Sequence, residues 1–252
     1  MDDKLTKLVE MTRTLGQPHL DYVIVGEGNT SCRADNGTFW VKASGQQMNG
    51  IGEGGFVQVH AQPILQMLEH SPGDLAAQKK VMEASRVDPA TKLMPSVEVS
   101  FHAMLLEECN AEYVGHTHPV AINQISCSSR AQEFAVKRMF PDQIVLCGPE
   151  SVYVPYVDPG LPLAVAIRER VRAYISKYNE PPKTILLGNH GLIVVGQTPT
   201  EILNVQAMAV KSARIFMGAC ALGEPAFMAD EDIPHIYRRP DEIYRRKQFV
   251  ER

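Results

Sequence analysis

The sequence VGHTHPVAIN (residues 114–123) places two histidines one residue apart, where an apolar run ends and a proline follows. In an extended strand the side chains alternate between faces, so His116 and His118 would point the same way. Pro119 has no N–H group and suits the first turn of a helix. The chain is therefore predicted to pass from a strand into a helix here, with two imidazoles side by side at a junction that can hold a metal ion.

A third histidine, His190, lies in LLGNHGLIVVG between two apolar runs. An ionisable ring between buried strands costs free energy unless it has a partner, and the glycine beside it permits a tight turn or a close approach to a ligand. Three histidines would leave a divalent ion with an open position, as catalytic zinc requires. On the residues alone, the HxH pair on a solvated strand face and His190 at a hairpin tip stay open as alternatives.

Three further short segments contain residues that can take part in catalysis or ligand binding. Glu98 lies in PSVEVSF at the start of an apolar helix pattern, where an acidic residue is also favoured by the helix dipole alone. The segments GEGNTS (26–31) and ASG (43–45) offer backbone N–H groups and small polar side chains, which can bind anions. Glycine loops also serve as plain turns, so each segment is a weak signal by itself.

Apolar periodicity indicates a chain that mixes helices and strands. Helices are expected over residues 5–15, 63–71, 95–110, 119–126, 161–179 and 198–223. Strands are expected within 22–33, over 38–45, 54–59, 112–118, 142–148 and 152–157, and on both sides of a turn in 183–196. Because strands also follow one another directly, the sheet is predicted to be mixed or antiparallel with helical flanks. Residues 71–94 are expected to form a mobile surface segment, and the basic tail over 232–252 to dock on another surface.

The overall composition excludes several classes of protein. The chain has 252 residues, 44% hydrophobic and 21% charged, which fits one globular domain with a sizeable core. A net charge of −4 argues against nucleic acid as a partner. Five widely spaced cysteines without a CxxC motif indicate a reducing compartment. The start has no signal-peptide core, and no apolar run reaches the ~18 residues of a membrane span, so a soluble, cytoplasmic protein without a membrane partner is expected.

Taken together and in chain order, GEGNTSCR, VKASG, PSVE, HTHP and GNHG resemble the class II aldolase/adducin family, which includes the fuculose-1-phosphate and rhamnulose-1-phosphate aldolases. The resemblance spans about residues 5–220. It implies an α/β fold with three α/β/α layers and a mixed, largely antiparallel central sheet. It also implies a single domain over 1–252, with a core over about 5–220 and a tail over 225–252, and a homotetramer with sites at subunit interfaces.

The resemblance assigns roles to particular residues. His116, His118 and His190 look like ligands for zinc or another divalent ion such as cobalt, manganese, iron or nickel. Glu98 looks like the catalytic acid or base. PYVDPG resembles the segment that lends a catalytic tyrosine, here Tyr156, to the neighbouring subunit's site. The residues that look like the substrate-binding and anion-binding set are Asn29, Ser31, Ser44, Gly45 and Ser96.

The activity implied is that of a metal-dependent carbon–carbon lyase, an aldolase of carbohydrate metabolism. Such an enzyme cleaves a ketose, a ketose phosphate or a related hydroxy-oxo compound through a metal-stabilised enediolate. Val97 and Gly26 stand where the phosphate-binding aldolases have hydroxyl groups, so a substrate with a carboxylate or without phosphate is plausible. Two alternatives are a decarboxylase or dehydratase of a small hydroxy or oxo acid on the same fold, and a non-catalytic, adducin-like scaffold.

Overall fold

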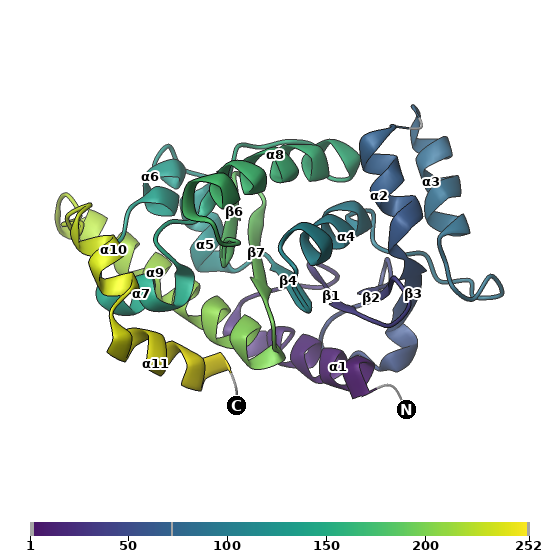
Figure 1. The fold of residues 1–252 in the computed structure, drawn as a ribbon, viewed down its shortest axis with the longest axis horizontal. Coiled ribbons are helices and arrows are strands. Elements are labelled where there is room, and N and C mark those ends of the chain that lie inside the picture. The colour runs from purple at the N-terminus through teal and green to yellow at the C-terminus, as the bar shows by residue number, and fades with distance from the viewer. Residues whose placement is uncertain (1–2, 72, 251–252) are drawn as a thin grey trace.

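The computed structural model describes residues 3–71 and 73–250. Its seven strands form one sheet in the order β3-β2-β1-β4-β7-β6-β5 (Figure 1). The strands are β1 (Asn29–Arg33), β2 (Thr38–Lys42), β3 (Phe56–His60), β4 (Tyr113–Thr117), β5 (Val152–Val154), β6 (Thr184–Leu187) and β7 (Gly191–Gly196). All neighbouring strands are antiparallel except β5 and β6, which are parallel. The predicted α/β class with a mixed, largely antiparallel sheet is confirmed.

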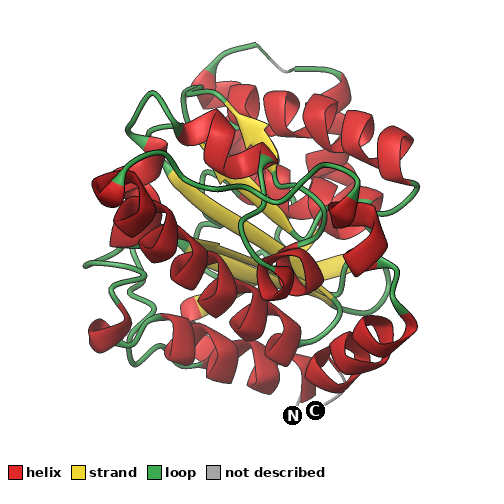
Figure 2. Ribbon diagram, turned by 90° about the vertical axis from the view of Figure 1, so that its left-hand side faces the viewer, coloured by secondary structure: helices red, strands yellow, loops and turns green. Residues whose placement is uncertain are grey.

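The helices lie on both faces of this sheet, so the strands form the middle layer (Figure 2). The α-helices in the described residues are α1 (Asp3–Leu15), α2 (Ala61–Glu69), α3 (Leu75–Ala84), α4 (Val99–Glu108), α5 (Val120–Ser126), α6 (Ala131–Val136), α7 (Pro141–Cys147), α8 (Leu161–Tyr178), α9 (Pro199–Leu222), α10 (Asp232–Tyr237) and α11 (Pro240–Val250). Two 3-10 helices, η1 (Pro18–Leu20) and η2 (Glu53–Gly55), complete the described elements.

Alternation along the central strands divides the core into two clusters. In β4, Val114 packs in the cluster that contains residues of α2, α4 and α8, whereas Tyr113 packs in the cluster of α1, α5 and α9. In β7, Ile193 and Val194 divide in the same way. Since side chains two residues apart share a face, the side chain of His116 lies on the α4 side of the sheet with Val114.

Two expectations about local structure are wrong, and a third segment contains a helix that the sequence pattern did not predict. Residues 142–147 lie in α7 and not in a strand, because Pro141 opens a helix and a short apolar run does not distinguish the two by its pattern. Residues 22–25 form a loop and not a strand, in which Val25 has a φ of 58°. The segment 71–94 contains α3, whose first turn is capped by the Asp74 side chain.

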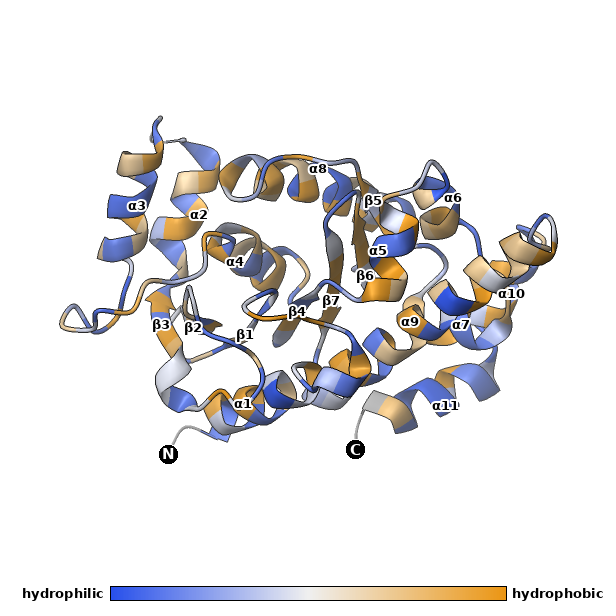
Figure 3. Cartoon of the chain, turned by 180° about the vertical axis from the view of Figure 1, so that it is seen from behind, coloured by the Kyte–Doolittle hydropathy of each residue, from blue (hydrophilic) through white to orange (hydrophobic). Residues whose placement is uncertain are grey.

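The C-terminal tail packs against its own chain. Ile233, Ile236 and Tyr237 of α10 form a small apolar cluster with Ile144 and Val145 of α7. Helix α11 follows along α7 and α9 and is mostly hydrophilic (Figure 3).

Helix α9 is the one described helix with the length and hydropathy of a membrane span. It nevertheless packs along β4, β7, α1, α5 and α7, and Ile202 and Val205 lie in the core. Its apolar character therefore has a structural reason within the fold.

Candidate metal centre and active site

Three histidines meet at one end of the central strands. His116 is the fourth residue of β4, His118 follows that strand directly, and His190 lies in the turn between β6 and β7. One ligand nitrogen from each ring lies within 4.8 Å of the others, and the ring centroids are 4.7 to 4.9 Å apart. Gly191 permits this approach, because a Cβ there would lie 2.6 Å from the Thr117 carbonyl oxygen and 2.8 Å from His118 Cδ2.

All three imidazoles are held in the neutral form that binds metals. Burial, followed by the nearby His190, lowers the pKa of His116 to about 3. Burial, followed by His116 and His190, lowers the pKa of His118 to about 3, and burial also lowers the pKa of His190. A group that stays unprotonated near neutral pH offers its lone pair to a ligand.

The geometry of the three rings fits a divalent ion. His116 Nδ1–H donates to the Leu192 carbonyl oxygen at 3.1 Å, so its Nε2 carries the lone pair. A hydrogen bond from the other ring nitrogen to a backbone carbonyl is the usual support of a metal-binding histidine. The Nε2 of His116 lies 3.0 Å from the Nε2 of His118. The buried Nδ1 of His190 and Oε1 of Glu98 have no hydrogen-bond partner among the described residues. Glu98 Oε1 lies 3.4 Å from His190 Nε2, so a cation bound by the histidine nitrogens near Glu98 would supply this oxygen with a partner.

Glu98 is directed at the histidines and does not cap its helix. It occupies the N-cap position of α4, but its side chain makes no capping hydrogen bond there. Its Oε2 lies 3.5 Å from His116 Nε2, and its Oε1 lies 3.4 Å from His190 Nε2. The side chain is buried, with 6% of the residue exposed. The helix dipole alone therefore does not account for this carboxylate.

A chain of hydrogen bonds behind the site fixes the Glu98 carboxylate. Asn29 Nδ2 donates to Glu98 Oε2 at 2.7 Å and to Ser96 Oγ at 3.1 Å. Because a carboxylate only accepts, the Asn29 amide oxygen must point the other way, where it accepts from His102 Nε2–H. The His102 Nδ1 then accepts from the Ser31 hydroxyl at 2.7 Å.

Sequence reasoning missed His102 and Lys42. His102 follows Glu98 by four residues, so both lie on one face of α4, and this spacing was the available signal. Burial lowers the pKa of His102 to about 3, so the ring stays neutral in the network. Lys42 ends β2 and is buried, which lowers its pKa, while the negative charge of Glu98 acts in the opposite direction. Its ammonium donates to the Gln46 carbonyl oxygen.

The residues predicted to bind an anion lie at two depths. Asn29, Ser31 and Ser96 are buried around the Glu98 carboxylate, and the Ser31 hydroxyl is used by His102. Ser44 and Gly45 are exposed in the loop after β2, where Gly45 has a φ of 78° that suits glycine. The site therefore has an inner polar wall and an outer loop.

Tyr156 lies in the loop after β5. Because β5 and β6 are parallel, this loop is at the same end of the strands as His190, which follows β6. A Cβ on Gly188, two residues before His190, would be 3.2 Å from the Tyr156 backbone nitrogen. The side chain of Tyr156 is exposed, and its hydroxyl donates to Asp158 Oδ1 at 3.1 Å, which raises the pKa of the phenol. The catalytic role of this tyrosine in a neighbouring subunit stays a prediction.

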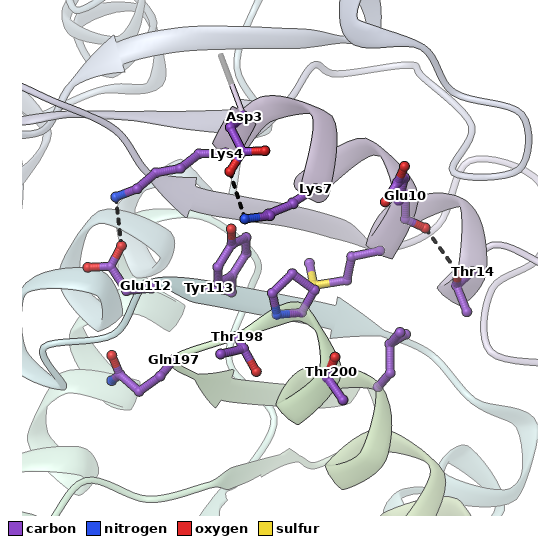
Figure 4. A pocket seen from close by; sticks show the side chains of 13 residues that line it. Asp3, Lys4, Lys7, Glu10, Thr14, Glu112, Tyr113, Gln197, Thr198 and Thr200 are labelled. Atoms are coloured by element: carbon purple, nitrogen blue, oxygen red, sulfur yellow. Dashed lines mark hydrogen bonds and ion pairs between the residues drawn. The ribbon is translucent and has the colours of Figure 1, made fainter. Parts of the chain in front are cut away.

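A cavity of about 640 Å³ lies between α1 and the start of α9, at the end of β4 that is opposite the histidines. Figure 4 shows two ion pairs in its wall: Lys4 with Glu112 at 2.8 Å and Lys7 with Asp3 at 2.6 Å. The predicted metal and catalytic residues are not among those that line it. This cavity is therefore separate from the candidate active site.

Comparison with known proteins gives a family and a fold. The family described as "Class II Aldolase and Adducin N-terminal domain" matches residues 6–217. "Uncharacterized oxidoreductase YuxG" of Bacillus subtilis is 27% identical over 181 residues, which are 69% of this chain and 24% of YuxG. The chain thus spans about a quarter of that relative's length.

Two further proteins match over most of their length. "3-oxo-tetronate 4-phosphate decarboxylase" of Haemophilus influenzae is 24% identical over 199 residues, which are 77% of this chain and 79% of the relative. A solved structure named "L-fuculose 1-phosphate aldolase" covers 94% of this chain and 95% of its own, with a TM-score of 0.71 and 17% identity. At that identity the second match shows the fold alone.

Proposed function

Since the chain belongs to the class II aldolase and adducin N-terminal domain family, we propose that it is a divalent-metal-dependent carbon–carbon lyase of the aldolase type. Its substrate would be a ketose, a ketose phosphate or a related hydroxy-oxo compound. The proposed ligands are His116, His118 and His190, with zinc as the first candidate ion. Glu98 is the proposed acid or base.

One observation carries this proposal. The Glu98 carboxylate lies 3.4 to 3.5 Å from two of the three converging histidines and is held there by Asn29. A scaffold domain has no need of a buried carboxylate beside three neutral imidazoles, since such a carboxylate costs free energy unless it is paired. Burial lowers the pKa values of the three histidines, and ionisable groups with shifted pKa values that cluster in this way are typical of functional sites.

The residues divide the chemistry among them. A divalent ion at the three histidines would act as a Lewis acid toward the substrate's carbonyl and hydroxyl oxygens. Glu98 would transfer a proton at the carbon next to the carbonyl, because its Oε1 is free of hydrogen bonds while Oε2 is fixed by Asn29. Ser44 and Gly45 would orient the remote end of the substrate. Tyr156, from a neighbouring subunit of a tetramer, would accept the proton of the hydroxyl group that becomes the aldehyde during cleavage, and would return it in the reverse reaction.

A decarboxylase is the second candidate. It is supported by the 24% identity to a 3-oxo-tetronate 4-phosphate decarboxylase that aligns over 79% of its length. Loss of carbon dioxide from a 3-oxo acid leaves negative charge at the same position as retro-aldol cleavage does. The same three histidines could therefore serve either reaction. We place either activity in the cytoplasm.

The test is an assay of the protein after removal of metal and after reloading with zinc, cobalt, manganese, iron or nickel. Release of an aldehyde is measured with free ketoses and ketose phosphates, and release of carbon dioxide with 3-oxo acids. Aldehyde release that depends on metal and disappears in Glu98→Gln is the expected result. Metal-dependent carbon dioxide release alone would favour the decarboxylase, and activity unaffected by metal removal would contradict both.

A further inference from the structure

A largely apolar cavity of about 470 Å³ opens beside the candidate active site. Its walls come from α3, from the segment that leads into α4, and from the start of α8. The apolar wall residues include Met82, Met94, Val97, Pro159, Leu161 and Pro162.

Two residues of the cavity wall, Val97 and Ser44, adjoin residues predicted for the site. Val97 lies between Ser96 and Glu98, whose side chains both bind Asn29, while its own side chain lines the cavity and is 60% exposed. Ser44 of the outer loop lines the same cavity. A substrate held at Glu98 with an arm directed toward Ser44 would reach this space.

The lining is poorly suited to a phosphate. Phosphate recognition takes several charge-assisted hydrogen bonds, usually from arginine or lysine. The polar side chains of the wall are those of Ser44, Gln78 and Lys79. Lys79 is the one cation among these, and its ammonium lies 4.0 Å from Glu83 Oε1 on the same helix.

The exposed apolar surface points to a hydrocarbon group. Leu75, at the start of α3, also lines the cavity and is 81% exposed. Covering such surface is favourable in proportion to its area, at about a fourfold gain in affinity for each methylene group buried. The cavity could accommodate several such groups.

We propose that this cavity receives an uncharged hydrocarbon arm of the substrate, an alkyl or aryl group joined to the reacting hydroxy-oxo unit. The inference rests on the proposed function, because the reacting unit is the part held at the three histidines. It names a substrate class that differs from the sugar phosphates, and it gives Val97 the role of a specificity-determining residue.

The test is binding of hydroxamates to the zinc-loaded protein, measured by calorimetry. A hydroxamate offers two neighbouring oxygens, as the carbonyl and hydroxyl groups of the substrate do. Acetohydroxamate should bind, and the affinity should rise about three- to fourfold for each methylene group added up to hexanohydroxamate. Phosphonoacetohydroxamate should bind no more tightly than acetohydroxamate.

Two variants locate the effect. Met94→Gln and Val97→Ser place polar atoms in the wall at nearly constant or reduced volume, so each should reduce the gain with chain length and leave acetohydroxamate binding within about twofold. Met217→Gln, a half-buried methionine of α9 far from this wall in the sequence, is the matched control and should keep the full gain.

Three outcomes would overturn the inference. The first is that acetohydroxamate binds but longer chains bind no more tightly, or that phosphonoacetohydroxamate binds more tightly than acetohydroxamate. Either result would support the metal centre and contradict the proposed hydrocarbon arm. The second is dissociation of an oligomer in Met94→Gln or Val97→Ser, seen by sedimentation, with the chain-length gain unchanged. That result would assign the surface to a second copy of the chain. The third is failure of acetohydroxamate itself to bind, which would overturn the proposed metal centre and this inference with it.

Discussion

The side-chain amide of Asn29 lies 2.7 Å from Glu98 Oε2, although 69 residues separate the two in the sequence. Asn29 opens β1 and is paired with His116 of the neighbouring strand β4, so the strand register places Asn29 beside the histidines and within reach of the carboxylate. This contact leaves Glu98 Oε1 without a hydrogen bond and faces it toward His190. The carboxylate is thus fixed by one oxygen and available through the other.

Replacing Glu98 should abolish turnover without abolishing the site. Glu98→Gln keeps the size of the side chain and its contact with Asn29 but removes the proton-transferring group. We expect at least a ~100-fold loss in kcat, with metal content and melting temperature close to those of the wild type. Glu83→Gln on α3 is the control, because Glu83 lies outside the hydrogen-bond network of the site. Normal turnover in Glu98→Gln would show that this carboxylate is structural.

His102 should act on catalysis through Asn29. His102→Leu leaves the Asn29 amide oxygen and the Ser31 hydroxyl without their partner, so the amide can turn away from Glu98. We expect kcat to fall more than KM rises, together with a loss of about 1–3 kcal/mol in the free energy of unfolding for an unsatisfied buried group. His102→Gln, which can again donate to Asn29, should recover part of kcat. Equal defects in the two variants would assign His102 to packing alone.

Buried neutral His102 should also make the metal-free protein sensitive to acid. Burial lowers its folded pKa from 6.5 to about 3, so between these values the unfolded chain binds the additional proton. Stability from this group is therefore complete above about pH 6.5 and falls as the pH decreases, by about 1.4 kcal/mol per pH unit for one proton. Urea unfolding between pH 4 and 6 should show a slope smaller by about that amount in His102→Gln than in the wild type.

The proposed role of Tyr156 in a neighbouring subunit predicts complementation. Tyr156→Phe and Glu98→Gln should each be nearly inactive alone. Subunits exchanged between the two would form some sites that carry both wild-type residues, so activity should return in the mixture. Mass spectrometry establishes that exchange has occurred. Mixed oligomers without activity would place the tyrosine's function, if any, within its own chain.

Much of this architecture could be predicted from local patterns. The HxH spacing at a strand end predicted two imidazoles side by side, and the family resemblance added His190 to them; the structure brings the three rings together, with one nitrogen of each within 4.8 Å of the others. The prediction of a strand over residues 142–148 was wrong, because an apolar run of that length suits a buried helix equally well. Pro141 favours the helix, since it occupies the first turn.

The features of the site that the sequence did not predict depend on contacts between segments that are distant in the chain. The use of the Ser31 hydroxyl by His102 follows from the packing of β1 against α4, which the sequence of neither element shows alone. The same holds for the apolar cavity beside Val97, whose walls come from four separate parts of the chain. The partner of Tyr156 depends on assembly, and a single chain does not contain that information.

The most direct measurement of the central claim is an anomalous difference map at the zinc absorption edge from crystals of the zinc-loaded protein. The account predicts one strong peak about 2.0–2.1 Å from a ring nitrogen of each of His116, His118 and His190, and loss of that peak in His118→Ala. A peak at another position, or an unchanged peak in His118→Ala, would contradict it.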